Sequence, residues 1–205
     1  MPRDYTIILR IVGIAIFAFG FSLLGQEGSA PRPEKVANTK ISIADITENS
    51  LQPFHLESSR ATVLFFVTHD CPISNAYSPE LARIHGEFSK KEIKLLLVYV
   101  DPDVTPKQIK EHMRDYGLQN YTAIQDSQHT LVSHTGADVT PEAVVVLPDA
   151  TIAYRGRIDN MYPALGKRRR TITKHELRDA LNAILENRPV TTARTKAIGC
   201  FIPNL

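Results

Sequence analysis

Two long apolar runs dominate the hydrophobic pattern of this chain. They are Ala61–Thr68 (ATVLFFVT) and Ile93–Val100 (IKLLLVYV). Both are rich in β-branched and aromatic residues, which is typical of strands buried on both faces of a sheet. A third apolar run, Ala143–Leu147, is followed by the turn residues 148–151 and then by Ile152–Arg157, which predicts a hairpin. The core is therefore expected to contain a sheet of at least four strands.

In most of the segments between these strands, the apolar residues are spaced as on one face of a helix. Starting signals such as a capping threonine followed by proline indicate where the helices begin. Alternation of strands and helices predicts an α/β fold with a mixed sheet flanked by helices on both faces. In chain order we expect a helix from Ser74 or Asn75 with Pro79 in its first turn, a helix capped by Thr105, a short strand over Thr122–Ile124, a short helix over His129–His134 and a helix over Lys174–Glu186.

The N-terminal segment differs from the rest of the chain. Arg3 and Arg10 precede an uncharged run over Ile11–Gln26, and small residues follow up to Ala30. This order is typical of a signal peptide or, as the alternative, of an N-terminal membrane anchor. Either interpretation predicts an exported domain, periplasmic or tethered to a membrane and facing away from the cytoplasm. The predicted organisation is a leader over 1–30, a linker over 31–38, a folded domain over 39–188 and a tail over 189–205.

Composition narrows the possible partners. The chain has 205 residues, of which 43% are hydrophobic, and a formal net charge of +2, so it can form a core and lacks the strongly basic character of nucleic-acid-binding proteins. The basic run Lys167–Arg170 is interpreted as a solvated loop, with an anionic surface as the alternative partner. The two cysteines allow one disulfide or one reactive thiol.

Cys71 is the leading candidate for chemistry. It follows the first apolar run and precedes a predicted helix, where backbone amides and the helix dipole favour a thiolate. The alternative is that Cys71 is a small buried core residue. Thr140-Pro141, at the entry to the third apolar run, is a candidate cis peptide bond that brings backbone close to a neighbouring site, with an ordinary trans bond as the alternative.

Three segments together resemble the thioredoxin-like superfamily, in its redoxin or peroxiredoxin-like (AhpC/TSA-type) branch. They are FFVTHDCPIS, TPEAVVV and TIAYRGRID. The resemblance implies a thioredoxin-like fold, Cys71 as the nucleophile, Pro141 as a cis-proline packed against it, and no cofactor. Ser74 departs from the CxxC pattern of thioredoxins, because serine cannot form the disulfide.

The peroxiredoxin pattern PxxxTxxC is matched in part. Thr68 and Cys71 supply TxxC, whereas Leu64 stands where that pattern has proline. In this interpretation Thr68 orients a peroxide, Cys71 becomes a sulfenic acid, and Arg155 or Arg157 supplies positive charge. Each arginine has the alternative role of a solvated or ion-paired residue. The expected enzyme is a thiol oxidoreductase that reduces peroxide or a disulfide-bearing protein and is restored by a thiol reductant.

Cys200 lies in the apolar stretch AIGCFI near the C-terminus. If the tail folds back over Cys71, Cys200 is a resolving cysteine, or the two cysteines form a structural bridge. A non-catalytic, partner-binding or copper-handling module is the alternative function, and resemblance to copper-delivery proteins of the same superfamily suggests His69, His134 and Cys200 as its ligands. These proteins carry a CxxxC pair that this chain does not have. The leading prediction therefore has no metal ligand.

Overall fold

The computed structural model describes residues 1, 34–36, 40–55, 58–203 and 205. From residue 34 onward, the described residues belong to one compact unit. Apart from Met1, the predicted leader lies outside the described residues. Within the described part of the chain, no helix has the length and apolar character needed to span a bilayer.

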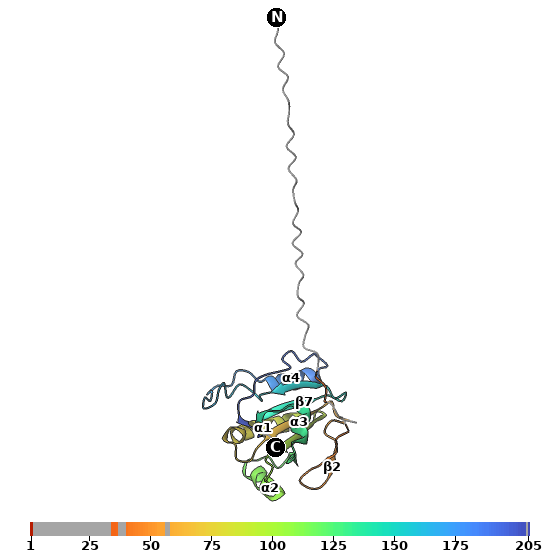
Figure 1. The fold of residues 1–205 in the computed structure, drawn as a ribbon, viewed down its shortest axis with the longest axis vertical. Helices are drawn as coiled ribbons and strands as arrows, with labels where there is room; N and C mark the ends of the chain where they lie inside the picture. The colour runs from red at the N-terminus through yellow and green to blue at the C-terminus, as the bar shows by residue number, and fades with distance from the viewer. Residues whose placement is uncertain (2–33, 37–39, 56–57, 204) are drawn as a thin grey trace. The chain divides into compact units, whose positions relative to one another are not determined.

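A five-stranded mixed sheet forms the centre of this unit (Figure 1). The strand order is β5-β4-β3-β7-β8, in which β3 is parallel to β4, β4 is parallel to β5, and β7 is antiparallel to both β3 and β8. Every residue of β3 and β7 is buried, as expected for continuous apolar runs in the middle of a sheet. The strands are β3 (Ala61–Val67), β4 (Ile93–Tyr99), β5 (Thr122–Gln125), β7 (Glu142–Val146) and β8 (Ile152–Gly156).

Helices cover both faces of the sheet, because alternate residues of each strand point to opposite sides. Val63 and Phe65 of β3 belong to one core cluster, which also contains the apolar residues of α1 (Pro72–Phe88), α2 (Pro106–Asp115) and α4 (Glu176–Leu185). Leu64 and Phe66 belong to a second cluster, which includes Leu131 of α3 (Thr130–Thr135). The predicted α/β fold with helices on both faces is confirmed.

The predicted position of Pro79 is wrong. Helix α1 begins at Pro72, directly after Cys71, so Pro79 lies inside the helix and not in its first turn. A proline has no backbone N–H, so the helical hydrogen bond to the carbonyl of Asn75 is missing at this point. Pro72, with its φ already suited to a helix, is the residue that starts α1.

Four two-residue strands were not predicted from the sequence. β1 (Ile43–Ala44) pairs with β2 (Ser50–Leu51), and β6 (Val139–Thr140) pairs with β9 (Cys200–Phe201), both antiparallel. Residues 34–36, inside the predicted linker, also pair with the domain, since the N–H groups of Val36 and Ile152 donate to the carbonyls of Ala150 and Glu34.

The C-terminal segment runs back along the sheet after α4. Arg155 of the edge strand β8 donates its N–H to the carbonyl of Ala193, and Thr195 donates to the carbonyl of Arg155. The segment then continues to β9, which pairs with β6. We call residues 190–202 the C-terminal strap. It supplies backbone partners to β8 and to β6.

Candidate active site

Cys71 occupies the N-cap of α1, at the junction with β3 predicted from the sequence. Its side chain is 2% exposed, and the N–H of Ser74 points to its sulfur at an N–S distance of 3.5 Å. The first turn of a helix has backbone N–H groups without helical partners, so this position favours negative charge. The site therefore suits a cysteine sulfur that leaves a disulfide as a thiolate.

The loop before β7 brings Thr140 and Pro141 to the same place. The Thr140–Pro141 peptide bond is cis, and the Thr140 carbonyl oxygen lies 3.4 Å from Cys71 Sγ. The hydroxyl groups of Thr140 and Thr68 are 3.3 Å apart. Thus Thr68, Cys71 and the Thr140–Pro141 bond, named from separate parts of the sequence, lie together.

Cys71 and Cys200 form a disulfide. The bond joins residues 129 positions apart, with a Cα–Cα distance of 6.3 Å. Of the alternatives left open by the sequence, the structure therefore has the tail folded back and the two cysteines joined.

Backbone contacts hold the strap next to Cys71. In the β6–β9 pairing, Thr140 lies opposite Cys200 and Val139 lies opposite Phe201. Gly199 is so close to this edge that an added Cβ would lie 2.0 Å from the carbonyl oxygen of Thr140. Only a residue without a side chain fits there without displacing backbone. Gly199 therefore lets the strap bring Cys200 to Cys71.

Ser74 is a site residue whose role the sequence analysis missed. It is 3% exposed, and among the described residues its hydroxyl has no hydrogen-bond partner. A buried polar group without a partner costs about 1–3 kcal/mol. Since the Ser74 N–H points to Cys71 Sγ, the unpartnered hydroxyl of the same residue is a candidate second donor to a thiolate formed there. The only sequence signal for it is its place in CPIS, three residues after Cys71 and at the expected start of the helix.

A chain of hydrogen bonds supports the His69–Cys71 loop from behind. Asn75 donates its amide to the carbonyl of His69, and His112 is paired through Nε2 with Asn75 Oδ1 at 2.9 Å. His112 Nδ1 lies 2.8 Å from the Tyr99 hydroxyl. Burial lowers the pKa of His112, so its neutral form is favoured. Neutral His112 accepts from Tyr99 and donates to Asn75, which fixes the start of α1.

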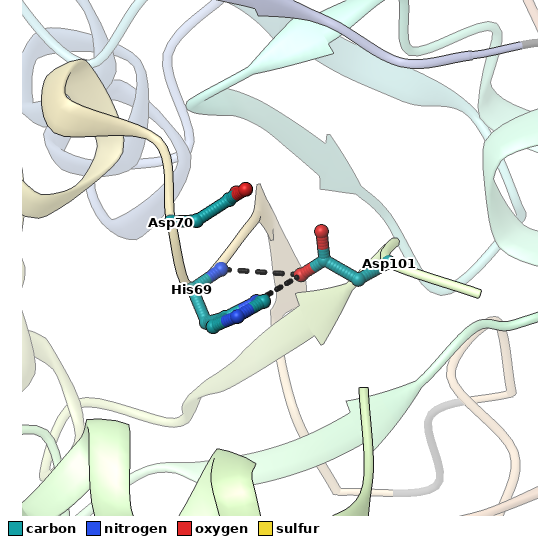
Figure 2. Close-up of side chains that lie close together, drawn as sticks. All are labelled: His69, Asp70 and Asp101. Atoms are coloured by element: carbon teal, nitrogen blue, oxygen red, sulfur yellow. Dashed lines mark hydrogen bonds and ion pairs between the residues drawn. The ribbon is translucent and has the colours of Figure 1, made fainter. Parts of the chain in front are cut away.

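His69, Asp70 and Asp101 form a polar cluster at the carboxyl ends of β3 and β4 (Figure 2). Asp101 accepts hydrogen bonds from the backbone N–H of His69 and from its ring, both at 3.1 Å. One ligand atom from each of the three residues lies within 4.8 Å of the others. These are the described residues that come close enough to share a metal ion.

The ligand set suggested for a copper site is not the set that the structure brings together. His134 Nδ1 is hydrogen-bonded to the carbonyl of Thr130 within α3, and Cys200 is bonded to Cys71. Only His69 of the suggested three belongs to the cluster with Asp70 and Asp101.

The two candidate arginines make contacts with other parts of the domain. Arg155 donates to the carbonyls of Thr135 and Gly136, at 2.9 and 2.8 Å, and so holds the loop that leads to Pro141. Arg157 forms an ion pair with Glu176 at the start of α4, with Nε 3.1 Å from Oε1. In this oxidised state both guanidinium groups therefore have structural partners.

Comparison with solved structures agrees with this architecture. An uncharacterised conserved protein from Geobacillus kaustophilus matches with a TM-score of 0.73 and 23% identity over 85% of this chain and 93% of that one. A hypothetical protein from Sinorhizobium meliloti 1021 matches with a TM-score of 0.71 and 22% identity over 85% and 94%. A candidate thioredoxin from Neisseria meningitidis matches with a TM-score of 0.57 and 19% identity over 75% and 92%.

These likenesses identify the class of protein as thioredoxin-like in fold. The family model for the AhpC/TSA family matches residues 34–155, which is more than half of the chain. The chain belongs to the AhpC/TSA family, as the resemblance of its motifs implied. The search of curated proteins found no significant match.

Proposed function

We propose that this protein is a thiol oxidoreductase in which Cys71 is the nucleophile and Cys200 the resolving cysteine. The observation that carries the proposal is the disulfide between them, placed at the first turn of α1 and beside the Thr140–Pro141 bond. Membership of the AhpC/TSA family and the fold support it. No cofactor is needed for thiol–disulfide exchange, because both electrons come from the two cysteines.

The first candidate reaction is exchange with a disulfide-bearing protein. In the reduced protein, the Cys71 thiolate attacks one sulfur of the substrate disulfide, and the other sulfur leaves as a thiolate. Cys200 then attacks Cys71 in the mixed disulfide, which releases the second substrate thiol and forms the Cys71–Cys200 bond. The substrate gains two electrons, and an external thiol reductant restores the two cysteines.

Peroxide reduction is the second candidate, and the position of Thr68 favours it. Thr68 precedes Cys71 by three residues, and its hydroxyl lies at the site, 3.3 Å from that of Thr140. Here Cys71 attacks one peroxide oxygen and becomes a sulfenic acid while the other oxygen leaves as water or an alcohol. Condensation with Cys200 releases water and gives the same disulfide. Arg155 and Arg157 remain candidates for stabilising the leaving oxygen, provided that either one changes partner in the reduced protein.

One set of variants tests the proposal and separates the two reactions. Wild type, Cys71→Ser and Cys200→Ser are reduced, freed of reductant, and mixed with either hydrogen peroxide or a protein disulfide. We expect Cys71→Ser to be inactive with both, and Cys200→Ser to accumulate a mixed disulfide or a sulfenic acid, detected by intact mass. Equal activity of wild type and Cys71→Ser would refute the proposed nucleophile.

We also propose that the protein works outside the cytoplasm. The apolar N-terminal run and the use of both cysteines in one disulfide support this, because such bonds persist in oxidising compartments. Cell fractionation with non-reducing mass analysis tests it. Recovery of the protein from the cytoplasm in reduced form would contradict it.

A further inference from the structure

The C-terminal strap occupies the backbone edge beside Cys71 in the manner of a bound peptide. Its β9 residues pair antiparallel with β6, immediately before Pro141, and its cysteine is bonded to Cys71. Backbone pairing of this kind gives affinity, while specificity comes from the side-chain space at each position. The space around each side chain of the strap therefore indicates which residue the β6 edge can accept at that position.

The position before the cysteine accepts only glycine. A Cβ built at Gly199 would lie 2.0 Å from the oxygen and 2.6 Å from the carbon of the Thr140 carbonyl, and 3.1 Å from the nitrogen of Pro141. All three are backbone atoms, and Thr140 is fully buried, so they cannot move aside as a flexible side chain would. A larger residue would push the neighbouring cysteine away from Cys71.

The two positions after the cysteine differ from each other. Phe201 is 80% exposed, so this position places no demand on the side chain. Ile202 packs against the second core cluster, and its N–H donates to the carbonyl of Asp138 at 3.0 Å. The second position after the cysteine thus favours an apolar residue.

We propose that the edge formed by β6 selects partner proteins with an extended Gly–Cys–x–apolar segment, and that the strap, which reads GCFI, is a tethered copy of that segment. This inference rests on the proposed function and adds its specificity. The partner and the strap compete for one edge, so each can replace the other during exchange.

The order of bond changes follows from this competition. With the strap displaced, the Cys71 thiolate attacks the cysteine of the partner's Gly–Cys–x–apolar segment, which is joined to a second sulfur in a disulfide. That second sulfur leaves as a thiolate. When the strap returns to β6, the Cys200 thiolate attacks Cys71, and the partner cysteine leaves as a thiolate. The partner disulfide is reduced by two electrons, and Cys71 and Cys200 are oxidised by two.

The test uses the full-length chain with Cys200→Ser and Gly199→Val, so that the strap cannot resolve the bond and is displaced from the edge. The probe is the peptide AIGCFIP, whose cysteine is joined to thionitrobenzoate. Attack by Cys71 on the peptide sulfur releases coloured thionitrobenzoate and leaves a mixed disulfide that intact mass identifies. Matched peptides carry alanine for the glycine, asparagine for the second isoleucine, or alanine for the phenylalanine.

We expect the glycine-to-alanine peptide to react at least about tenfold more slowly than AIGCFIP, a factor equal to about 1.4 kcal/mol. The isoleucine-to-asparagine peptide should also react more slowly, and the phenylalanine-to-alanine peptide should match AIGCFIP. Equal rates for the glycine and alanine peptides would overturn the inference.

Two controls separate the possible failures. If Cys71 does not react with the small disulfide dithiobis(nitrobenzoate) in folded protein, the proposed nucleophile fails. If it reacts with that reagent and with all peptides alike, only the proposed selectivity fails. If the double variant does not fold, the single variant Cys200→Ser is used. Its strap competes with every peptide and lowers all the rates, but the order of the peptide rates is expected to stay the same.

Discussion

The two halves of the disulfide lie in very different surroundings. Cys71 is 2% exposed, between the fully buried strand β3 and a helix of 17 residues. Cys200 belongs to a strand of two residues, and the next residue, Phe201, is 80% exposed. One cysteine is held by the core, and the other by a short backbone pairing and the covalent bond itself.

This difference agrees with the separate tasks that we propose for the two cysteines. A nucleophile needs a fixed position near donors, which the junction of β3 and α1 provides. A resolving cysteine has to leave and return, which a segment with few buried side chains can do at low cost. We therefore expect substitutions on the Cys71 side to alter reactivity, and substitutions on the Cys200 side to alter how firmly the strap is attached.

The largest expected effect comes from Cys200→Ala. In the chain-entropy model, a crosslink over 129 residues stabilises the folded protein by about 5 kcal/mol. Denaturant unfolding of the oxidised wild type and the variant should show a difference of this size. After reduction the two proteins should have nearly the same free energy of unfolding. A difference that persists after reduction would mean that Cys200 contributes mainly through packing.

Gly199→Val tests whether the strap lies as closely on β6 as described. The added side chain meets the Thr140 backbone, so the free energy of unfolding of the oxidised protein should fall by about 3 kcal/mol, the upper range for overpacking. Phe201→Ala, two residues further along the strap, is the matched control and should change this free energy by less than about 0.5 kcal/mol. Similar values for the two variants would contradict this position of the strap.

Ser74→Ala tests the Cys71 side. Loss of a hydroxyl donor to the thiolate should slow alkylation of Cys71 in the reduced protein by about tenfold, since a hydrogen bond to a charged group contributes about 1.5–3 kcal/mol. Ser78→Ala, the same substitution one turn further along α1 at another buried serine, should leave the rate unchanged. If both variants react as wild type does, the hydroxyl of Ser74 does not act on the sulfur.

The smallest expected effect is a pH dependence from His112. Burial lowers its pKa below the ordinary value of 6.5, so below pH 6.5 the unfolded chain binds a proton that the folded protein does not. Stability from this group is therefore present above pH 6.5 and decreases on acidification until the folded-state pKa is passed. Denaturant unfolding at several pH values should show this decrease in wild type and not in His112→Gln. A parallel pH profile in the two proteins would contradict it.

Much of the fold was predictable from the sequence because its core strands are continuous apolar runs. Ala61–Val67 and Ile93–Tyr99 agree with the prediction to within one residue. β6 and β9 were missed because a strand of two residues has no periodicity to detect. Their pairing depends on the path of the strap, which only the folded domain determines.

The parts of the candidate site that have a local sequence signal were predictable. Cys71 at the end of an apolar run, Thr68 three residues earlier and the Thr140–Pro141 bond before the next run could each be named from the sequence. The link to Cys200 stayed open because its main determinant, Gly199, is informative only beside the Thr140 carbonyl. The Tyr99–His112–Asn75 chain was missed because its members come from three separate elements.

Pro141 has a further consequence for self-association. Exposed strand edges can pair with other molecules and start aggregation. Because proline lacks an N–H, the ladder that β6 offers is interrupted at Pro141 once the strap has left. The uncovered edge can thus accept a short extended segment such as the strap, but it offers no continuous ladder on which a longer sheet could grow.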